Sequence, residues 1–256
     1  MITTKLAKGT WNQDDYYDQA RAASQVEHPS LTLIQARYRG KNILEVGCGE
    51  GTKLARLQAK TRTGLDISRV AIKRAKTVLD FAVVGNAESL QFESNRFDGV
   101  LSFFSLEHFE HPELVIAEML RVAKVGGEIV ILTPNFGAPN RSSPCFVGSR
   151  LRKLIVGLIN DFMPFQRSLA WNHVTPLSVD HRYESDYDTL VEPYLHSLIG
   201  YLKSQNLEII VSSSNWAVAM QAESLLQKLF RVLGEWGIYP FTYWGPHAFV
   251  IARKKL

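Results

Sequence analysis

The stretch that decides the fold is Glu45-Val46-Gly47-Cys48-Gly49-Glu50-Gly51, which overlaps the end of the short apolar run at residues 42–46. Glycines at such a turn let the backbone bend tightly and approach a ligand closely, because they carry no Cβ. The pattern predicts a strand, a ligand-binding loop and then a helix over residues 52–59, whose amino terminus would offer unpaired N–H groups. A nucleotide-like ligand fits this arrangement.

The spacing of the glycines separates this loop from the dinucleotide-binding fingerprint. That fingerprint has two residues before its third glycine, whereas here Glu50 alone separates Gly49 from Gly51. Glu45 and Glu50 would repel a pyrophosphate, but they suit a cationic ligand such as a sulfonium that also carries an ammonium group. The sequence therefore disfavours NAD.

Further apolar runs downstream predict a parallel sheet wrapped by helices. We expect strands at residues 42–46, 61–66, 81–84, 97–103, 128–132, 207–213 and 248–253. Helix-like segments at 68–79 and 112–125 alternate with these strands, which is typical of an α/β fold with helices on both faces of the sheet.

Two polar positions follow the second and third expected strands. Asp66 lies 19 positions after Gly47, where a carboxylate can accept both hydroxyl protons of a ribose diol. Asn86 and Glu88 follow the third strand, where an amide or a carboxylate can meet the amino group of adenine. These positions predict a ligand that contains adenosine.

Together these residues resemble the class I S-adenosylmethionine-dependent methyltransferases, whose order of motifs matches residues 43–134. Leu106-Glu107-His108, residues 121–127 and Thr133-Pro134-Asn135 are similar to the small-molecule branch that includes the ubiquinone-pathway O-methyltransferases. The resemblance implies a Rossmann-like, seven-stranded, mostly parallel sheet with a reversed seventh strand. It also implies S-adenosyl-L-methionine as the cofactor.

The resemblance further implies a role for each matching position. The three glycines of the loop would wrap the methionine moiety, Asp66 would bind the ribose, and Asn86 with Ala87 would border the adenine. Phe103 would pack beside the cofactor, and Cys48 suits packing in the loop better than nucleophilic chemistry. The expected cofactor-binding residues are Glu45, Gly47, Cys48, Gly49, Gly51, Asp66, Ile67, Asn86, Ala87 and Phe103.

The candidate catalytic residue is His108. It follows the fourth strand, is expected to face the acceptor pocket and is expected to titrate near neutral pH, as a general base should. The alternative is a histidine that only bonds to a backbone carbonyl or to Glu107. Other candidates for the base are His173, His181 and Tyr183. Some quinone O-methyltransferases carry a metal-site glutamate three residues before the Glu-His pair, but that position here is Phe104, so no metal is expected.

The chain is expected to form one domain, residues 1–256, with four parts. These are an N-terminal helical cap (1–40), a cofactor-binding half (41–133), a proline-rich insertion or acceptor lid after the fifth strand (134–201), and C-terminal strands with an intervening helix (202–256). Within the cap, Trp11, Tyr16 and Tyr17 would form either a lid over the cofactor or an anchor for the first helix.

Arg150–Met163 is predicted to be an amphipathic helix with one apolar stripe beside basic residues. Three roles remain open for the stripe: packing on its own domain, a homodimer contact, or peripheral membrane contact. A second amphipathic stretch covers residues 219–236. Arg141–Arg182 holds six basic and two acidic residues, +4, which equals the net charge of the whole chain, 29 − 25. A patch confined to one segment favours an anionic partner over a uniformly basic nucleic-acid binder.

Composition limits the class of protein. With 46% hydrophobic and 21% charged residues the chain can bury a core, and two cysteines are too few for a disulfide framework. The sequence shows no secretory signal and no apolar run of membrane-spanning length. We therefore expect a cytoplasmic location, with peripheral contact on the inner membrane face as an alternative.

The expected function is methyl transfer from S-adenosyl-L-methionine to an oxygen of a small or lipid- or glycan-linked acceptor. One alternative is a nucleic-acid methyltransferase, although residues 104–107 do not read as the Asn/Asp-Pro-Pro-Tyr/Phe motif that commonly holds a flipped base. The other is a non-catalytic adaptor that binds a partner or a membrane through Arg150–Met163. The acceptor itself is not readable from the sequence.

Overall fold

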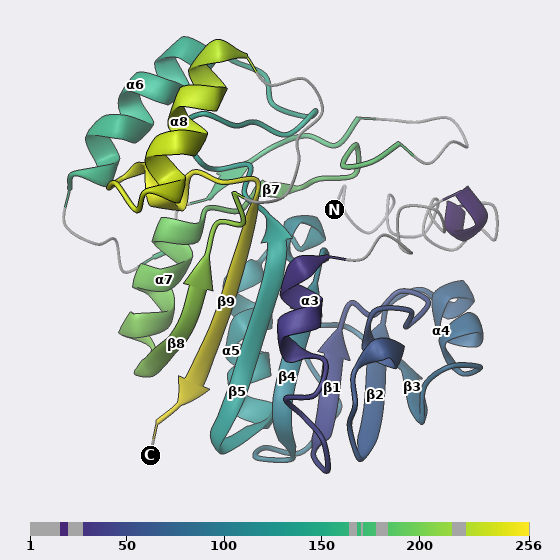
Figure 1. Cartoon of the computed structure of the whole chain (residues 1–256). Helices are drawn as coiled ribbons and strands as arrows, with labels where there is room; N and C mark the ends of the chain where they lie inside the picture. The colour runs from purple at the N-terminus through teal and green to yellow at the C-terminus, as the bar shows by residue number, and fades with distance from the viewer. Residues whose placement is uncertain are drawn as a thin grey trace.

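The computed structural model describes residues 16–19, 28–163, 168–169, 171–177, 184–216 and 224–255 of the chain. Its main sheet has seven strands in the order β3-β2-β1-β4-β5-β9-β8 (Figure 1). The strands are β1 (Asn42–Val46), β2 (Thr61–Asp66), β3 (Phe81–Val84), β4 (Phe97–Phe103), β5 (Ala123–Pro134), β8 (Leu207–Ser213) and β9 (His247–Lys254). The predicted seven-stranded α/β fold is confirmed.

The sheet is mixed because β9, the last of its strands along the chain, runs opposite to the others. β1 pairs in parallel with β2 and β4, and β5 pairs in parallel with β4. β9 lies antiparallel between β5 and β8, with Leu132 opposite Phe249. The carboxyl ends of the parallel strands therefore meet at one edge, which is where open α/β sheets bind ligands.

Helices cover both faces of the sheet. One face carries α3 (Pro29–Ile34) and α4 (Arg69–Ala75), and the other carries α5 (Pro112–Val122) and α7 (Leu195–Ser204). In β5, Val130 and Leu132 join the core with α3 and α4, whereas Ile129 and Ile131 join the core with α5 and α7. Strand side chains that point alternately to two buried layers explain why the strands are apolar without strict alternation.

The helix predicted directly after the glycine loop is wrong. Residues 52–59 contain only the short 3-10 helix η1 (Leu54–Arg56). The Gln58 amide donates to the Gln35 carbonyl at 2.7 Å, which links the segment to the chain after α3. This tertiary contact takes the place of continued helical bonding, so local propensity is overridden. α4 and α5 also end before the predicted residues 79 and 125.

A further group of elements lies beyond the carboxyl edge of the sheet (Figure 1). It consists of α6 (Arg150–Asp161), β6 (Asn172–His173), β7 (Val191–Glu192), α8 (Leu225–Glu235) and η3 (Phe241–Tyr243). β6 and β7 form a separate two-stranded sheet. Both predicted amphipathic segments thus contain helices. The segment 134–201 also contains most of α7, which packs on β8 and β9.

The inward side of α6 is polar. Lys153 Nζ lies 2.7 Å from a carboxylate oxygen of Glu192, and both side chains are buried. Asp161 is also buried, and it accepts hydrogen bonds from the Tyr194 hydroxyl at 2.6 Å and the Trp244 indole at 2.7 Å. These bonds satisfy charges that would otherwise be costly to bury, so they hold α6 in this orientation.

The apolar stripe of α6 consequently faces outward. Its exposed members are Leu151, Ile155, Leu158, Ile159, Phe162 and Met163, while Leu154 packs inward. Of the roles left open for the stripe, packing on its own domain is therefore wrong.

In the described part of the chain, no helix is both long and apolar enough to cross a membrane. Trp11, His181 and Tyr183, which the sequence singled out, lie outside the described residues.

Candidate active site

The main site is a cavity of about 370 Å³ at the carboxyl ends of the first four strands, here called the strand-end cavity. This volume is within the range of small-molecule sites. The expected residues that line it are Gly47, Gly49, Asp66, Ile67, Asn86, Ala87 and His108. The structure thus brings together residues at the carboxyl ends of β1, β2, β3 and β4.

The glycine loop has two different reasons to lack side chains. Gly47 has φ +73°, and a Cβ there would lie 2.6 Å from the Cβ of Ser105, so a side chain is excluded by packing on the end of β4. Gly49 has φ +52°, and a Cβ there would meet no heavy atom within 4 Å. The room beside Gly49 is therefore open space at the cavity wall, suited to the close approach of a ligand.

Asp66 is fixed by the same loop. One of its carboxylate oxygens accepts from the Gly49 amide at 2.8 Å, and the other accepts from the Ser68 amide at 2.8 Å. Burial raises the pKa of Asp66, and these two hydrogen bonds oppose the rise. A carboxylate oxygen has two lone pairs, so each can also accept a ligand hydroxyl.

Glu45 lies behind the loop and does not line the cavity. It is buried, and its Oε2 atom has no hydrogen-bond partner among the described residues. Burial raises the pKa of Glu45 to about 8, which Lys53 opposes and Asp66 increases. An unpartnered buried carboxylate oxygen calls for an explanation, and a nearby cationic group would supply one.

Three other expected residues also lie outside the strand-end cavity. The Cys48 thiol is buried and donates to the Gly49 carbonyl at 3.4 Å, and burial raises its pKa, so the group is held as a thiol. A Cβ on Gly51 would lie 2.7 Å from Leu79. Phe103 is buried in the core beside α3 and α4.

Phe104 reaches the cavity instead of Phe103. Its φ is +54°, an uncommon backbone conformation for a large side chain, and such strain is concentrated at functional sites. Its ring meets the rings of His28 and His247 edge-on, with centroids 5.6 and 5.3 Å away. Strand alternation ends at Phe103, so no sequence pattern could show this turn.

His108 sits among carboxylates rather than alone. Its Nδ1 lies 3.2 Å from the Asp188 carbonyl oxygen and 3.5 Å from the Asp188 carboxylate, and its Nε2 lies 3.8 Å from Glu107. Burial lowers the pKa of His108, but Asp188, Glu107 and Asp186 together outweigh burial and raise it to about 9. The expectation that His108 titrates near neutral pH is therefore wrong, since its cation is stable there.

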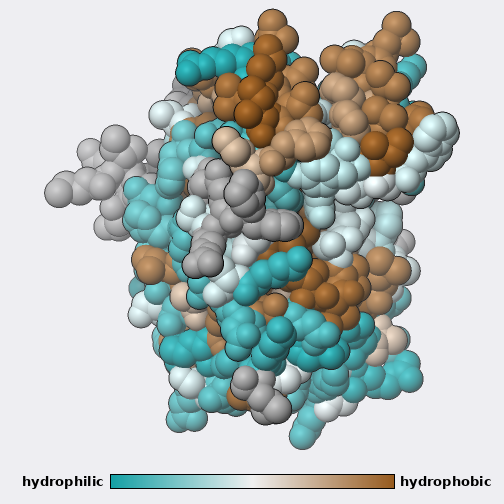
Figure 2. Space-filling view, turned by 90° about the vertical axis from the view of Figure 1, so that its left-hand side faces the viewer, coloured by the Kyte–Doolittle hydropathy of each residue, from teal (hydrophilic) through white to brown (hydrophobic). Residues whose placement is uncertain are grey.

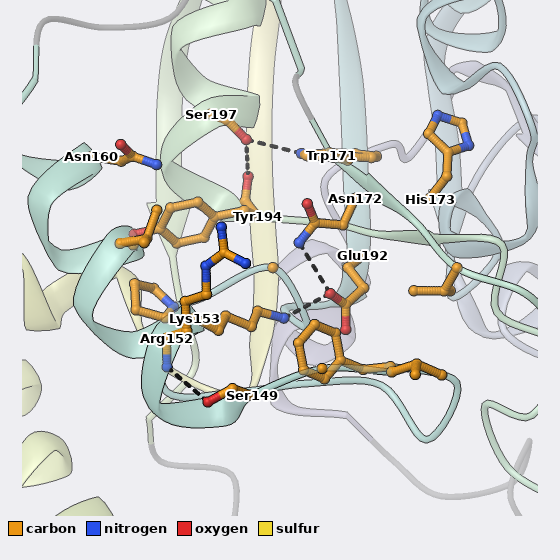
Figure 3. Close-up of a pocket in the computed structure, with 18 of the residues that line it drawn as sticks. Ser149, Arg152, Lys153, Asn160, Trp171, Asn172, His173, Glu192, Tyr194 and Ser197 are labelled. Atoms are coloured by element: carbon orange, nitrogen blue, oxygen red, sulfur yellow. Dashed lines mark hydrogen bonds and ion pairs between the residues drawn. The ribbon is translucent and has the colours of Figure 1, made fainter.

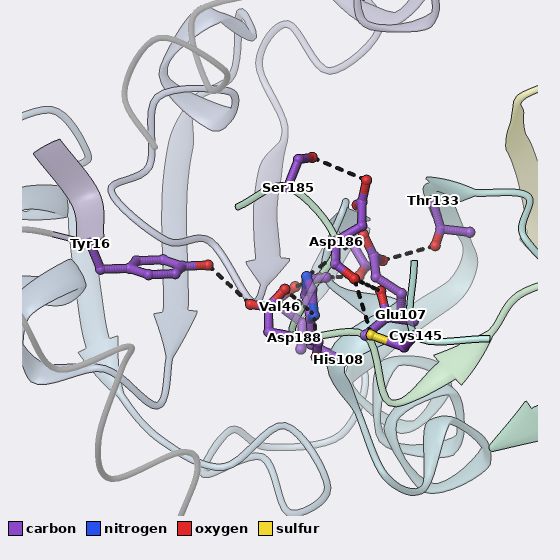
Figure 4. A network of polar contacts seen from close by, with 12 residues as sticks. Tyr16, Val46, Glu107, His108, Thr133, Cys145, Ser185, Asp186 and Asp188 are labelled. Carbon is purple, nitrogen blue, oxygen red and sulfur yellow. Dashed lines mark hydrogen bonds and ion pairs between the residues drawn. The ribbon is translucent and has the colours of Figure 1, made fainter. Parts of the chain in front are cut away.

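The surroundings of His108 form a buried polar network (Figure 4). The Thr133 hydroxyl donates to Glu107 at 2.9 Å, and burial raises the pKa of Glu107 to about 7 although His108 opposes the rise. The Cys145 thiol donates to the Tyr187 carbonyl at 3.1 Å. The network joins the end of β4 to the segment 184–190.

Tyr16 and Tyr17 line the cavity from the N-terminal side. The Tyr16 hydroxyl donates to the Asp188 carboxylate at 3.1 Å, which connects the two walls (Figure 4). Two roles were left open for these tyrosines, a lid over the cofactor and an anchor for the first helix. Their position in the cavity wall favours the lid. Asp188 itself was missed, because only the fold brings residue 188 to the end of β4.

A second cavity of about 670 Å³ lies beneath α6 and is here called the α6 cavity. Arg152 and Asn160 of α6 line it, opposite Asn172 and His173 of β6 (Figure 3). Thr175 lines the α6 cavity and Pro176 lines the strand-end cavity, so the two are neighbours across this segment.

Metal binding has no visible basis in the part of the chain that the structure covers. Among those residues, no group of three or more His, Cys, Asp or Glu side chains is arranged to hold a metal ion.

Comparison with known proteins matches the part of the chain that contains the glycine loop. Residues 44–131 match a family model described as a methyltransferase domain. Demethylmenaquinone methyltransferase of Renibacterium salmoninarum is 34% identical over 109 residues, which cover 38% of this chain and 44% of that protein. Phthiotriol/phenolphthiotriol dimycocerosates methyltransferase 1 of Mycobacterium ulcerans is 37% identical over 108 residues, covering 39% and 40%. Phosphatidylethanolamine N-methyltransferase of Cereibacter sphaeroides is 32% identical over 110 residues, covering 40% and 54%. The matches thus span about half, or less, of these relatives.

Solved structures resemble the chain over most of its length. The YcgJ protein of Bacillus subtilis has a TM-score of 0.56 at 16% identity, covering 90% of this chain and all of that one. An S-adenosylmethionine-dependent methyltransferase of Mesorhizobium loti has a TM-score of 0.52 at 17% identity, covering 88% and 96%. The [4+2]-cyclase SpnF has a TM-score of 0.53 at 18% identity, covering 100% and 93%. At such identities these likenesses show the fold alone.

Proposed function

We propose that this chain, whose residues 44–131 match a methyltransferase-domain model, is an S-adenosylmethionine-dependent methyltransferase that methylates an oxygen of a small or lipid- or glycan-linked acceptor. One observation carries the proposal: Gly49 and Asp66 form one wall of the strand-end cavity. The Asp66 carboxylate accepts a hydrogen bond from the Gly49 amide, and the space beside the Gly49 Cα is open. S-adenosyl-L-methionine supplies an activated methyl group, so the protein's task is to position both reactants and to exclude water.

The residues of the cavity suit different parts of this cofactor. Asp66 would bind the ribose diol, and the open side of Gly49 would face the methionine moiety. Asn86 and Ala87 would border the adenine, as would Ile67.

The names of the relatives support a class of acceptor. The relatives are named for demethylmenaquinone, phthiotriol/phenolphthiotriol dimycocerosates and phosphatidylethanolamine, which supports an amphiphilic acceptor. Their names do not specify oxygen, which is part of the proposal. The α6 cavity, which adjoins the strand-end cavity at residues 175 and 176, has the volume for the polar part of such a molecule.

His108 is the proposed proton-handling residue, because it lines the cavity at the end of β4. The carboxylates around it favour its cation, so at neutral pH it would orient the acceptor as a hydrogen-bond donor. It would serve as a base only in the fraction that has lost its proton, which grows as the pH approaches about 9.

Isothermal titration calorimetry with S-adenosylhomocysteine tests the cofactor assignment. Asp66→Ala should weaken binding by about tenfold to a hundredfold, because a hydrogen bond to a charged group contributes about 1.5–3 kcal/mol. The matched control is Asp98→Ala, which removes a carboxylate that also accepts a backbone amide, that of Asn42, at the opposite edge of the sheet. That variant should keep the wild-type dissociation constant. A wild-type protein that does not bind millimolar ligand would refute the assignment.

The acceptor class is tested separately with radiolabelled S-adenosyl-L-methionine and total cell extract. Label should enter the fraction that is extracted into organic solvent. Incorporation into nucleic acid alone would reject the proposed acceptor class while leaving the cofactor assignment in place.

A further inference from the structure

Two helices at the same end of the molecule carry apolar side chains on their outer sides. On and directly after α6, Leu151, Ile155, Ile159 and Phe162 are between 51% and 67% exposed. On and after α8 the exposed side chains are Leu225, Leu226, Leu229 and Trp236. Figure 2 shows these helices as two brown ridges at the top of the molecule with a groove between them. These eight residues are here called the α6–α8 face.

The exposure is built into the fold. The inner side of α6 is held by the buried polar contacts of Lys153 and Asp161. On α8, Phe230 stacks on Phe241 with ring centroids 5.3 Å apart. The Ser224 side chain and the amide of Gln227 also form one half of a capping box that begins α8. The apolar sides of both helices face outward because their inner sides are held by these contacts with the rest of the protein.

The charges beside this face are mostly positive. Arg150 and Arg152 are exposed on α6, and Lys228 is exposed on α8. Asp161 of α6 is buried, which leaves Glu235 as the exposed acidic residue on these two helices. An apolar ridge with cationic flanks is the pattern of helices that lie in the interface of an anionic membrane.

We propose that the α6–α8 face docks on the surface of a membrane that contains anionic lipid. The apolar side chains would enter the boundary between head groups and acyl chains, while Arg150, Arg152 and Lys228 would meet lipid phosphates. The same helix α6 forms a wall of the α6 cavity, so docking would bring that cavity to the lipid head groups.

The charge pattern argues against a second copy of the chain as the occupant. In a twofold contact the same patch meets itself, so the cations of α6 and α8 would face one another. An anionic lipid surface neutralises them instead. The inference stands on the exposed face and does not depend on the proposed methyl transfer.

Vesicle binding of the full chain is the direct test. Wild-type protein should float with vesicles of phosphatidylcholine and phosphatidylglycerol, and binding to pure phosphatidylcholine should be much weaker. Raising the salt from about 0.1 M to 1 M shortens the Debye length from about 10 Å to about 3 Å, so binding to the anionic vesicles should fall. Arg150→Gln and Arg152→Gln should each lower the partition coefficient about fivefold, which corresponds to about 1 kcal/mol per cation near the surface.

Apolar contact is tested with one variant in each ridge. Ile155→Glu and Leu229→Glu should each reduce vesicle binding at least tenfold, and both positions are exposed, so folding should be unchanged. The matched control is Val125→Glu. Val125 is 49% exposed, and it lies near the start of β5, at the end of the sheet far from α6 and α8. It should bind vesicles as the wild-type protein does.

Tryptophan fluorescence tests insertion in the wild-type protein. Among the tryptophans that the structure describes, Trp236 is 75% exposed, whereas Trp171, Trp216 and Trp244 are buried. Brominated phospholipid should quench the emission, and Trp236→Phe should remove most of that quenching.

Several outcomes would overturn the proposal. They are no binding of wild-type protein to anionic vesicles, equal loss of binding by Val125→Glu, and unchanged quenching in Trp236→Phe. A wild-type dimer in analytical ultracentrifugation that Ile155→Glu and Leu229→Glu convert to monomer, without vesicle binding, would assign the face to self-association. Binding of S-adenosylhomocysteine should be the same in all of these variants, so failure here leaves the proposed function untouched.

Discussion

At the scale of single residues, two glycines of one loop should respond differently to the same substitution. Gly51→Ala places a Cβ 2.7 Å from Leu79 at φ +77°, so crowding adds to backbone strain. We expect a loss of about 2–4 kcal/mol in the free energy of unfolding. Gly49→Ala adds a methyl group that meets no protein atom within 4 Å, so it should lose only about 1–2 kcal/mol, from strain.

For ligand binding, Gly49→Ala should be the more harmful of the two substitutions. The methyl group of Gly49→Ala occupies the cavity wall, so this variant should bind S-adenosylhomocysteine more weakly than Gly51→Ala does at a temperature where both are folded. Urea unfolding and calorimetry measure the two effects. Equal affinities for the two variants would contradict the assignment of Gly49 to the ligand side.

The protonation of His108 is a second property of single residues. Asp188 is the principal carboxylate that raises its pKa to about 9. Asp188→Asn should therefore lower that pKa, because the neutral amide no longer favours the imidazolium. NMR titration of labelled histidine measures it, with His108→Gln to assign the signal. Glu184→Gln, an exposed change in the same segment, is the control and should leave the pKa unchanged. A signal that titrates near pH 6.5 in wild-type protein would contradict this account of the site.

At the scale of elements, the sequence predicted what local pattern determines. Most strands of the main sheet contain an apolar run bounded by polar or glycine residues, so their positions were found, although β2 has little apolar sequence and β5 begins at Ala123 rather than at residue 128. The predicted helix at 52–59 failed because the Gln58 amide bonds to Gln35, a contact that no local pattern contains. α7 has a clear helical pattern in Leu195, Leu198 and Leu202, but it follows Pro193 inside a proline-rich segment and was assigned to the insertion.

Some residues of the candidate site could be predicted from local motifs, and others could not. Gly47, Gly49 and Asp66 sit in motifs with fixed spacing, so their meeting at one edge follows from parallel strands. Phe104 depends on a positive φ, and Asp188 arrives from a distant segment, so neither had a local signal. For α6 the apolar stripe was correct, but the side that it faces was decided by Glu192 and other partners remote in sequence.

At the scale of the whole molecule, a pair of histidines, the buried His28 and the half-buried His247, joins the start of α3 to the start of β9. His28 Nε2 lies 3.0 Å from His247 Nδ1, and His28 Nδ1 accepts from the Ser30 amide, so His28 is the donor to His247. This arrangement requires both rings to be neutral. Burial lowers the pKa of His28 to about 4 and that of His247 to about 3, with smaller contributions from Lys53, Arg141 and the pair itself.

These shifts predict that acid destabilises the fold. Between about pH 6.5 and pH 4 the unfolded chain takes up protons on both histidines and the folded chain does not, so stability falls as the pH falls. Each site contributes up to about 1.4 kcal/mol per pH unit in that window. His247→Gln removes one of the two sites, so its unfolding free energy should depend less steeply on pH although it is lower at pH 7. His111→Gln, an exposed change at the start of α5, should keep the wild-type slope. Urea unfolding at a series of pH values measures the slopes, and equal slopes for His247→Gln and wild-type protein would show that the pair does not couple folding to pH.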